Sequence, residues 1–427
     1  MTEQARHTLA AMQRKPHTLR PLLVVAGAGL ALAVVCLVVL GAFLPVIFEE
    51  KAASAPVVRA ARPGETRAAL ERAAQALRAG DRKAFDAALP ASGFAARRAT
   101  AALYRHLARL PWTSLRLAAK PVPGRPGRFD VRAVGEVGGA GPADRILAER
   151  ILTVSVLGGR LIVSGDETPA AVAHQNVMAF DRPVAVRRNG SVVIADKAEE
   201  DRAADIARAV APARERLKLL GISSRKPVVI YYFASRQELR RALGGPAEQR
   251  IKFFSRAPDR VSSAPGTDRD VGVLGPALDG KEAWIPLMLA HELTHAYTAG
   301  WFARTKHAPT LLAEGLATAV EGGRTYQPLR DDLAAGESQF PLETAIAAGS
   351  LWSGNSIDKV RLGYLEGGSL VLYVLDGWGL ADLRRFVTAA SDSDLSREGL
   401  DEAVRTSLGV GWDEFYAGWA AFVQTLP

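Results

Sequence analysis

HELTH, at residues 291–295, is the stretch of sequence that decides the fold of this chain. The apolar segment AWIPLMLA precedes it and indicates that the motif lies on a buried helix. Residues four apart on a helix share one face, so the imidazoles of His291 and His295 can reach one metal ion. Glu292 lies between them and is placed to accept a proton from a water molecule beside the ion. The motif therefore predicts a metal centre with its own general base.

A second segment, LLAEGLATAVEGG at residues 311–323, supplies the third ligand. Glu314 follows His295 after a gap of eighteen residues, and its neighbours are apolar, which favours a buried position. A catalytic zinc site needs three protein ligands and one open position, so the predicted Zn²⁺ ligands are His291, His295 and Glu314. Glu321 lies two helical turns further on the same face and is expected to hydrogen-bond a ligand imidazole.

These motifs resemble those of the gluzincin metallopeptidases, the group that includes thermolysin and aminopeptidase N. HELTH, the eighteen-residue gap and AEGLA carry the resemblance, and YLEGGSL at residues 364–370, followed by Tyr373, extends it. More closely, the chain is similar to the short peptidase MA-like domains of bacterial surface proteins, although it lacks the tryptophan before LLAEGLA. The resemblance covers residues 184–427 and implies a two-lobed, zincin-like metallopeptidase domain with a helical C-terminal lobe.

The resemblance also implies a role for each residue of the motifs. His291, His295 and Glu314 would bind zinc, while Glu292 would act first as general base and then as general acid. Glu321 matches the glutamate that supports the metal site in the aminopeptidase branch.

In related enzymes a tyrosine or histidine of the lower lobe stabilises the oxyanion, and Tyr364 is the candidate here, with Tyr373 in reserve. The Gly-x-Met-Glu-Asn segment that holds a free amino terminus in the aminopeptidase branch is absent from the sequence. An endopeptidase acting on a peptide or protein substrate is therefore expected, rather than an exopeptidase. The substrate strand is expected to pair along RDVGVLG, at residues 269–275.

The pattern of the chain after Val184 fits this layout. Apolar runs and helical periodicity predict strand, helix, strand, helix and strand before the HELTH helix, in the segments SVVIAD, KAEEDRAADIARAVAPARERLKLLG, KPVVIYYFAS, RQELRRAL and RDVGVLG. Residues 341–427 are predicted to be almost entirely helical.

Residues 21–48 are uncharged and mostly apolar, and they follow a basic segment, residues 1–20. As a helix this run would span about 40 Å, more than the ~30 Å hydrocarbon core. We therefore expect a single transmembrane anchor, a cytoplasmic N-terminus and an extracytoplasmic catalytic domain in the cell membrane. A cleaved signal peptide is the alternative, but Pro56 after the small-x-small segment Ala53-Ser54-Ala55 disfavours it. Residues 49–64 are expected to be a linker.

Residues 65–170 are predicted to form a small α+β domain, because helical segments come first and strands follow. The order resembles the cone-shaped domains of the nuclear transport factor 2-like superfamily. Ala79-Gly80-Asp81 and Phe85 match that pattern, whereas Gly158-Gly159-Arg160-Leu161 departs from it at the aromatic position. A spacer or protein-contact role is favoured over ligand binding, because no polar cluster stands out. The predicted fold class of the whole chain is α+β.

The composition and charge of the chain disfavour several classes of protein. The net charge is +9, but no basic stripe with interleaved aromatic residues is present, so nucleic acid is not an expected partner. The single cysteine, Cys36, excludes an internal disulfide. An intramembrane protease is disfavoured because only one uncharged run exceeds twenty residues. The alternative to an enzyme is a membrane-tethered binding or sensor protein that retains a zincin fold, but such a protein would not need Glu292.

Overall fold

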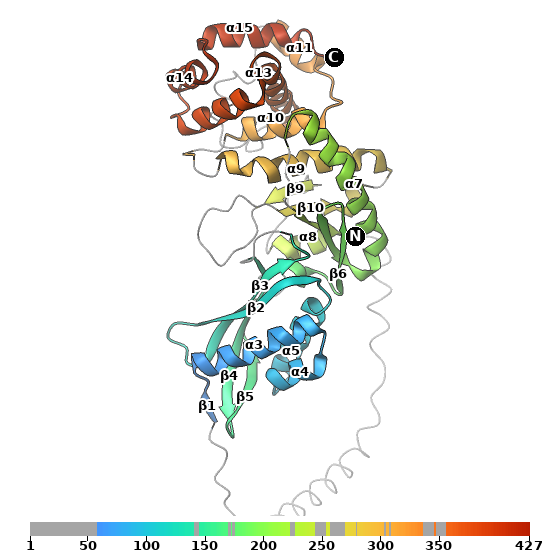
Figure 1. Cartoon of the computed structure of the whole chain (residues 1–427), viewed down its shortest axis with the longest axis vertical. Helices are drawn as coiled ribbons and strands as arrows, with labels where there is room; N and C mark the ends of the chain where they lie inside the picture. Colours follow the sequence, from blue (N-terminus) through green and yellow to red (C-terminus); the bar gives the residue numbers. More distant parts are fainter. Residues whose placement is uncertain are drawn as a thin grey trace, which may run out of the picture. The chain divides into compact units, whose positions relative to one another are not determined.

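The computed structural model describes most of the chain after its first 57 residues (Figure 1). The described range is residues 58–427 apart from 141–144, 170–171, 173–175, 223–226, 244–252, 257–269, 279, 303–304, 307–308, 336–345 and 347–355.

The structure is α+β, but the membrane-spanning part of the predicted fold is not supported. No helix among the described residues is long and apolar enough to cross a membrane. The longest helix, α13 (Ile357–Asp392), carries charged residues along its length, and the apolar α9 (Ile285–Phe302) carries the polar HELTH motif. The predicted span, residues 21–48, lies outside the described residues. The described part of the chain is therefore an α+β fold that contains no such helix.

The first described region contains three helices followed by an antiparallel sheet. Its elements are β1 (Val58–Ala60), α3 (Pro63–Ala79), α4 (Arg82–Ala88), α5 (Phe94–Leu107), β2 (Trp112–Pro121), β3 (Arg128–Val137), β4 (Ile146–Leu157) and β5 (Arg160–Asp166). The sheet has the order β1-β4-β3-β2, with β5 also paired to β4. Gly80 ends α3 in the left-handed conformation, and the Asp81 carboxylate accepts the Ala84 amide at 2.9 Å to begin α4. The chain therefore changes from one helix to the next at Gly80-Asp81.

A mixed five-stranded sheet forms the second region. Its strands are β6 (Pro183–Arg188), β7 (Ser191–Asp196), β8 (Val228–Phe233), β9 (Phe253–Arg256) and β10 (Asp270–Leu274), in the order β6-β7-β8-β10-β9. Its helices are α7 (Glu200–Leu219) and α8 (Arg236–Leu243), with 3₁₀ turns η1 (Asn176–Ala179), η2 (Lys197–Glu199), η3 (Gly275–Ala277) and η4 (Glu282–Trp284). Strands β7, β8 and β10 are parallel, and the two outer strands run antiparallel to their neighbours.

The position of β10 corrects one prediction. Strand β10 pairs with β8 on one side and with β9 on the other, so RDVGVLG does not lie at the edge of the sheet. The space for β9 comes from Gly272, because a Cβ atom there would lie 2.1 Å from the ring of Phe254. A substrate strand therefore cannot pair along β10 as predicted.

The two faces of this sheet belong to different hydrophobic cores. Val193, Ile230 and Val271 pack with residues of α7 and α9. Ile194 and Tyr231, on the opposite face, join one continuous core with the helices and strands of the first region. A buried ion pair also links the regions, because Arg145 Nη2 lies 2.6 Å from Asp270 Oδ1 and both side chains are at most 3% exposed.

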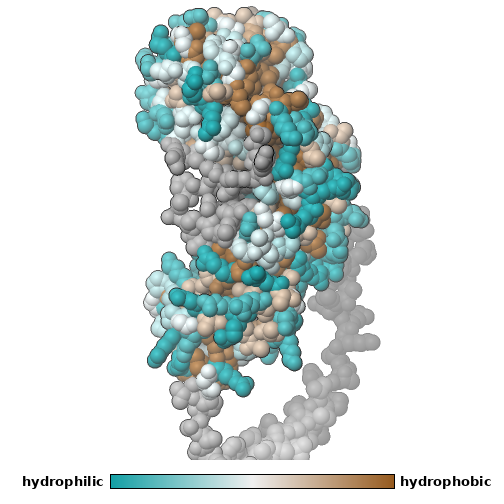
Figure 2. Space-filling view, viewed as in Figure 1, coloured by the Kyte–Doolittle hydropathy of each residue, from teal (hydrophilic) through white to brown (hydrophobic). Residues whose placement is uncertain are grey.

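The C-terminal region is helical, as expected. It contains α9, α10 (Thr310–Glu321), α11 (Gln327–Ala334), α13, α14 (Arg397–Leu408) and α15 (Trp412–Val423). Helix α13 is interrupted at Gly379, which has a φ of 81°. Trp412, Phe415 and Trp419 of α15 are buried in the core of this region. On the face shown in Figure 2, hydrophilic residues are widespread and hydrophobic residues form smaller areas among them.

Helices α10 and α13 touch through their backbones. A Cβ atom on Gly315 would lie 2.4 Å from the Gly367 carbonyl oxygen, and one on Gly367 would lie 2.5 Å from the Leu311 carbonyl oxygen. Only glycine at both positions permits this approach. The glycines of the AEGLA and YLEGGSL motifs therefore set the spacing between the helices that carry Glu314 and Tyr364.

We expect Gly315→Ala to lower the free energy of unfolding by about 1–3 kcal/mol, because the added methyl group forces two backbones apart. Gly377→Ala is the matched control: it lies on α13 with nothing within 4 Å of its Cβ position, and should stabilise the helix by up to roughly 1 kcal/mol. Denaturant unfolding of both variants measures the difference. Equal stability of the two variants would contradict the close contact.

Candidate metal centre

Helix α9 presents both histidines of HELTH on one buried face. His291 and His295 lie one turn apart, with their ring centroids 5.1 Å apart and the rings nearly perpendicular. The first turns of α9, including Leu289, Ala290 and Leu293, are buried against the second sheet and α7. This packing fixes the helix, so the two imidazoles have a defined direction.

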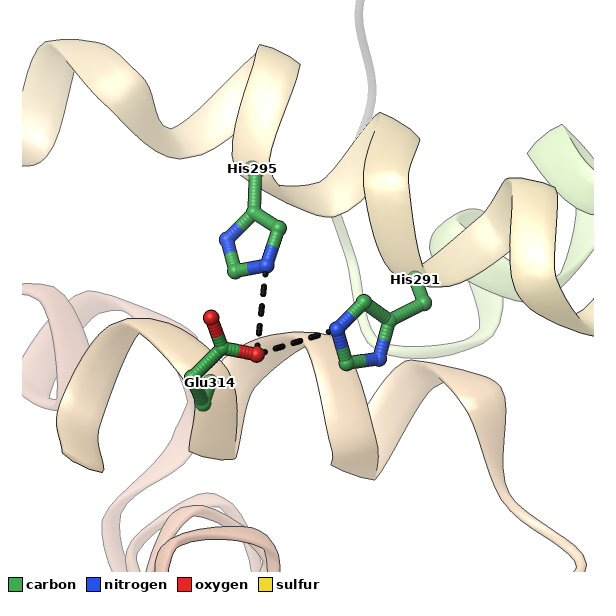
Figure 3. Close-up of side chains that lie close together, drawn as sticks. All are labelled: His291, His295 and Glu314. Atoms are coloured by element: carbon green, nitrogen blue, oxygen red, sulfur yellow. Dashed lines mark hydrogen bonds and ion pairs between the residues drawn. The ribbon is translucent and has the colours of Figure 1, made fainter. Parts of the chain in front are cut away.

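Helix α10 brings a carboxylate to the same point. Glu314 Oε2 lies 3.1 Å from His291 Nε2 and 3.5 Å from His295 Nε2, and Figure 3 shows the three side chains converging from the two helices. Helix α10 begins at Thr310 with Pro309 as its N-cap, so Thr310 is the first helical residue rather than the cap. The structure thus brings the three predicted ligands together.

The three side chains fit a zinc ion. Ligand atoms that each lie about 2.0–2.1 Å from a tetrahedral ion are roughly 3.3 Å apart, and the two contacts made by Glu314 bracket that separation. All three donor atoms lie within 4.8 Å of one another. Two imidazole nitrogens and one carboxylate oxygen are also a donor set that zinc prefers. The site can therefore hold Zn²⁺ through His291, His295 and Glu314.

Glu321 occupies the position expected of a supporting carboxylate. Its Oε2 lies 3.2 Å from His291 Nδ1, the ring nitrogen that faces away from Glu314. A proton on Nδ1 donated to Glu321 leaves Nε2 free to bind a metal ion. Glu321 is buried at the end of α10, where Arg216 Nη2 donates to its carbonyl oxygen at 2.7 Å.

Arg324 is a residue of the site that sequence reasoning missed. Its Nη2 donates to Glu321 Oε2 at 2.7 Å, so it holds the carboxylate that supports His291. Gly322 and Gly323, with φ values of 64° and 68°, turn the chain back after α10 and bring Arg324 to this position. The two consecutive glycines after a buried helix were the available signal for such a turn.

Burial and charge together set the protonation of His291 and Glu314. Burial alone would lower the pKa of His291, but Glu314 and Glu321 outweigh it and raise the pKa to about 10. Burial also opposes ionisation of Glu314, yet the charges of His295 and His291 hold the pKa of its carboxyl well below the usual range. Protonated His291 and ionised Glu314 therefore form an ion pair, and a metal ion must displace a proton from His291.

Glu292 lies on α9 between the two histidines in sequence, but it is not one of the three predicted metal ligands. Its side chain is buried, and burial raises the pKa of its carboxyl above the ordinary value, with the neighbouring histidines acting in the opposite direction. A carboxylate with a raised pKa is a better proton acceptor at neutral pH.

The two candidate tyrosines lie in different environments. The Tyr364 ring centroid is 6.1 Å from that of His291, and the Arg324 guanidinium carbon lies 5.7 Å from the Tyr364 ring. Tyr373 instead packs against Phe415 and other aromatic residues of the helical region. The structure therefore places Tyr364 beside the predicted metal ligand His291 and Tyr373 in the helical core.

No protein-family model, no curated protein and no solved structure matches this chain. The interpretation of the site therefore depends on its residues and their geometry.

We expect the purified chain to bind about one equivalent of Zn²⁺ through this site. His291→Ala and Glu314→Ala should each weaken zinc binding by more than about 100-fold, because each removes a ligand. Loss of a residue that only hydrogen-bonds a ligand typically costs roughly 10–100-fold. Competition with a chromogenic chelator measures the affinity. Glu292→Gln is the control, since it keeps all three ligands and should retain zinc. Full zinc occupancy in His291→Ala would show that the ligand set is wrong.

Proposed function

We propose that this protein is a zinc-dependent metallopeptidase that hydrolyses peptide bonds. The observation that carries the proposal is the convergence of His291, His295 and Glu314 on one point, with the buried carboxylate of Glu292 on the same helix. A site that only stored a metal ion would have no use for an additional carboxylate with a raised pKa beside the three ligands.

Zinc held by the three ligands would polarise a substrate carbonyl group and lower the pKa of a neighbouring water molecule toward ~7. A Glu292 carboxylate oxygen accepts the proton of the attacking water, and the same carboxyl group then delivers it to the nitrogen of the leaving amine. Glu321 and Arg324 keep the His291 ring in one orientation throughout. The Tyr364 hydroxyl donates to the carbonyl oxygen of the substrate as negative charge develops on it.

A large cavity next to the metal centre supplies room for a polypeptide. Its volume is about 1160 Å³, and it is lined by Leu287 and Met288 of α9, Leu362 and Leu365 of α13, and Glu321. The apolar lining suits hydrophobic substrate side chains. The size of the cavity and the absence of an amino-terminus-binding segment support an endopeptidase.

Backbone pairing with the substrate is proposed at β9 instead of β10. Within the part of the chain that the structure describes, β9 is the outer strand of the second sheet next to β10, and its other side has no strand partner. Helix α9 lies next to β9. An extended peptide could therefore add to this edge, close to the helix that carries the metal ligands.

Glu292→Gln tests the proposed general base. The variant should keep Zn²⁺ and lose roughly 10²- to 10⁴-fold in kcat on a quenched-fluorescence peptide library, because the amide cannot accept the proton. Removal of zinc from the wild-type protein with 1,10-phenanthroline should abolish hydrolysis, and added Zn²⁺ should restore it. Unchanged activity of the zinc-loaded Glu292→Gln protein would refute the mechanism. Zinc binding without any hydrolysis by the wild-type protein would favour a binding or sensor function.

Tyr364→Phe tests the oxyanion donor. Loss of the hydroxyl should lower kcat by about 10²- to 10³-fold with little change in KM, because the interaction forms mainly in the transition state. Tyr373→Phe is the matched control, because its ring lies in the helical core and its hydroxyl lies against Gly418 of α15. The measurement is the kcat of peptide hydrolysis by both variants at matched zinc occupancy. Equal rates for the two variants would exclude Tyr364 from this role.

A further inference from the structure

A second cavity is lined by residues of the first and second regions, and none of them belongs to the candidate metal centre. Its volume is about 410 Å³, within the usual range for small-molecule sites. Residues of α5, β4, β5 and α8 line it, together with Met178 and Phe180 near η1.

The cavity is strongly basic. Four arginines line it, Arg98 and Arg105 from α5, Arg150 from β4 and Arg241 from α8, against two aspartates, Asp166 and Asp181. Arg98 and Arg105 are seven residues apart and therefore share one face of α5. The lining thus has an excess of two positive charges, even with His106 neutral.

Arg150 is the innermost of these cations, and its charge is poorly compensated. Its side chain is only 7% exposed, and its nearest carboxylate, that of Asp166, lies 3.8 Å away. The other oxygen of Asp166 is engaged by Thr168, whose amide donates to it at 3.0 Å. Arg150 Nε is buried and has no hydrogen-bond partner among the residues that the structure describes. A buried guanidinium with an unused donor points to a missing acceptor.

Two further observations agree with a missing anion. Burial and the nearby charge of Arg98 both lower the pKa of Arg150, and the attraction of Asp166 does not compensate for them. Arg241 Nε, from α8, is likewise buried without a hydrogen-bond partner in the described part of the chain, and Arg241 lines the same cavity. Donors from two different elements therefore surround the same space.

The remaining wall is apolar. It is formed by Phe94, Ala95, Ala99, Ala102, Met178 and Phe180. Phe94 is 78% exposed, although a phenylalanine is normally at least half-buried, so it offers free apolar surface at this cavity. A ligand that matches the cavity has an anionic group toward Arg150 and an apolar body toward α5.

We propose that this cavity is a binding site for a small organic anion, a carboxylate or a phosphate monoester that carries a compact apolar group. The anion accepts hydrogen bonds from Arg150 and Arg241, Arg98 and Arg105 add electrostatic attraction, and the apolar group packs on Phe94 and the alanines of α5. The site is independent of the proposed peptidase chemistry, since it shares no residue with the metal centre.

Isothermal titration calorimetry of the full-length chain with benzoate and with phenyl phosphate tests the proposal. At least one of the two anions should bind, and neutral benzyl alcohol should bind at least tenfold more weakly. Comparison of the two anions separates a carboxylate site from a phosphate site. Arg150→Gln should weaken binding of the preferred anion about tenfold or more, which corresponds to about 1.4 kcal/mol for one lost charge-assisted contact. Arg98→Gln should weaken it about threefold, because it removes electrostatic attraction without removing a hydrogen bond.

Arg97→Gln is the matched control, because Arg97 precedes Arg98 on α5 but does not line the cavity. It should bind the preferred anion as the wild-type chain does. Arg98 is exposed, so its variant remains informative if Arg150→Gln fails to fold. No binding of either anion at millimolar concentration would overturn the proposal. Equal loss of binding in Arg97→Gln and Arg98→Gln would also overturn it, because it would show a general effect of surface charge.

Discussion

The hydrogen bond between His291 Nδ1 and Glu321 is the interaction on which the site depends. It decides which ring nitrogen faces Glu314, and so whether α9 and α10 can share one ion. The bond itself depends on Arg324, which holds the carboxylate, and on Arg216, which binds the last carbonyl groups of α10. Each of these charged groups lies beside an oppositely charged or polar partner, which offsets the cost of removing it from water.

A second constraint is the distance between α10 and α13, which two glycines set. Gly315 and Gly367 remove the side chains that would otherwise separate α10 from α13. The carboxylate of Glu314 lies next to one of these glycines, and Tyr364 lies one turn before the other. A shift of either helix by the width of a methyl group would therefore move a ligand and the proposed oxyanion donor together. The motifs AEGLA and YLEGGSL thus contain both the reactive side chains and the spacing that positions them.

Local patterns were sufficient to predict most single elements of the fold. Helical segments ahead of strands in residues 65–170 were predictable, because helical patterns depend on residues close in sequence. The spacing of HELTH and Glu314 predicted the candidate metal ligands, because it depends on residues that share one helix face. The patterns did not reveal β2, or the place of β10 inside its sheet. Strand neighbours are set by contacts between distant segments, such as Phe254 over Gly272, which no periodicity encodes. The sequence did not indicate Arg324 for the same reason. Its contact with Glu321 forms only because Gly322 and Gly323 reverse the chain direction after α10.

The buried pair of Arg145 and Asp270 has a consequence for how the protein is built. Removing one partner of such a pair leaves a lone charge in an apolar interior, at a cost of about 3–5 kcal/mol. The hydrophobic core beside the pair is likewise shared, because Ile194 and Tyr231 contact residues that belong to the first region. The first 110 or so described residues therefore do not have a hydrophobic core that is separate from the second region. They share one hydrophobic core with the second region, and without them one face of the second sheet would be exposed to solvent.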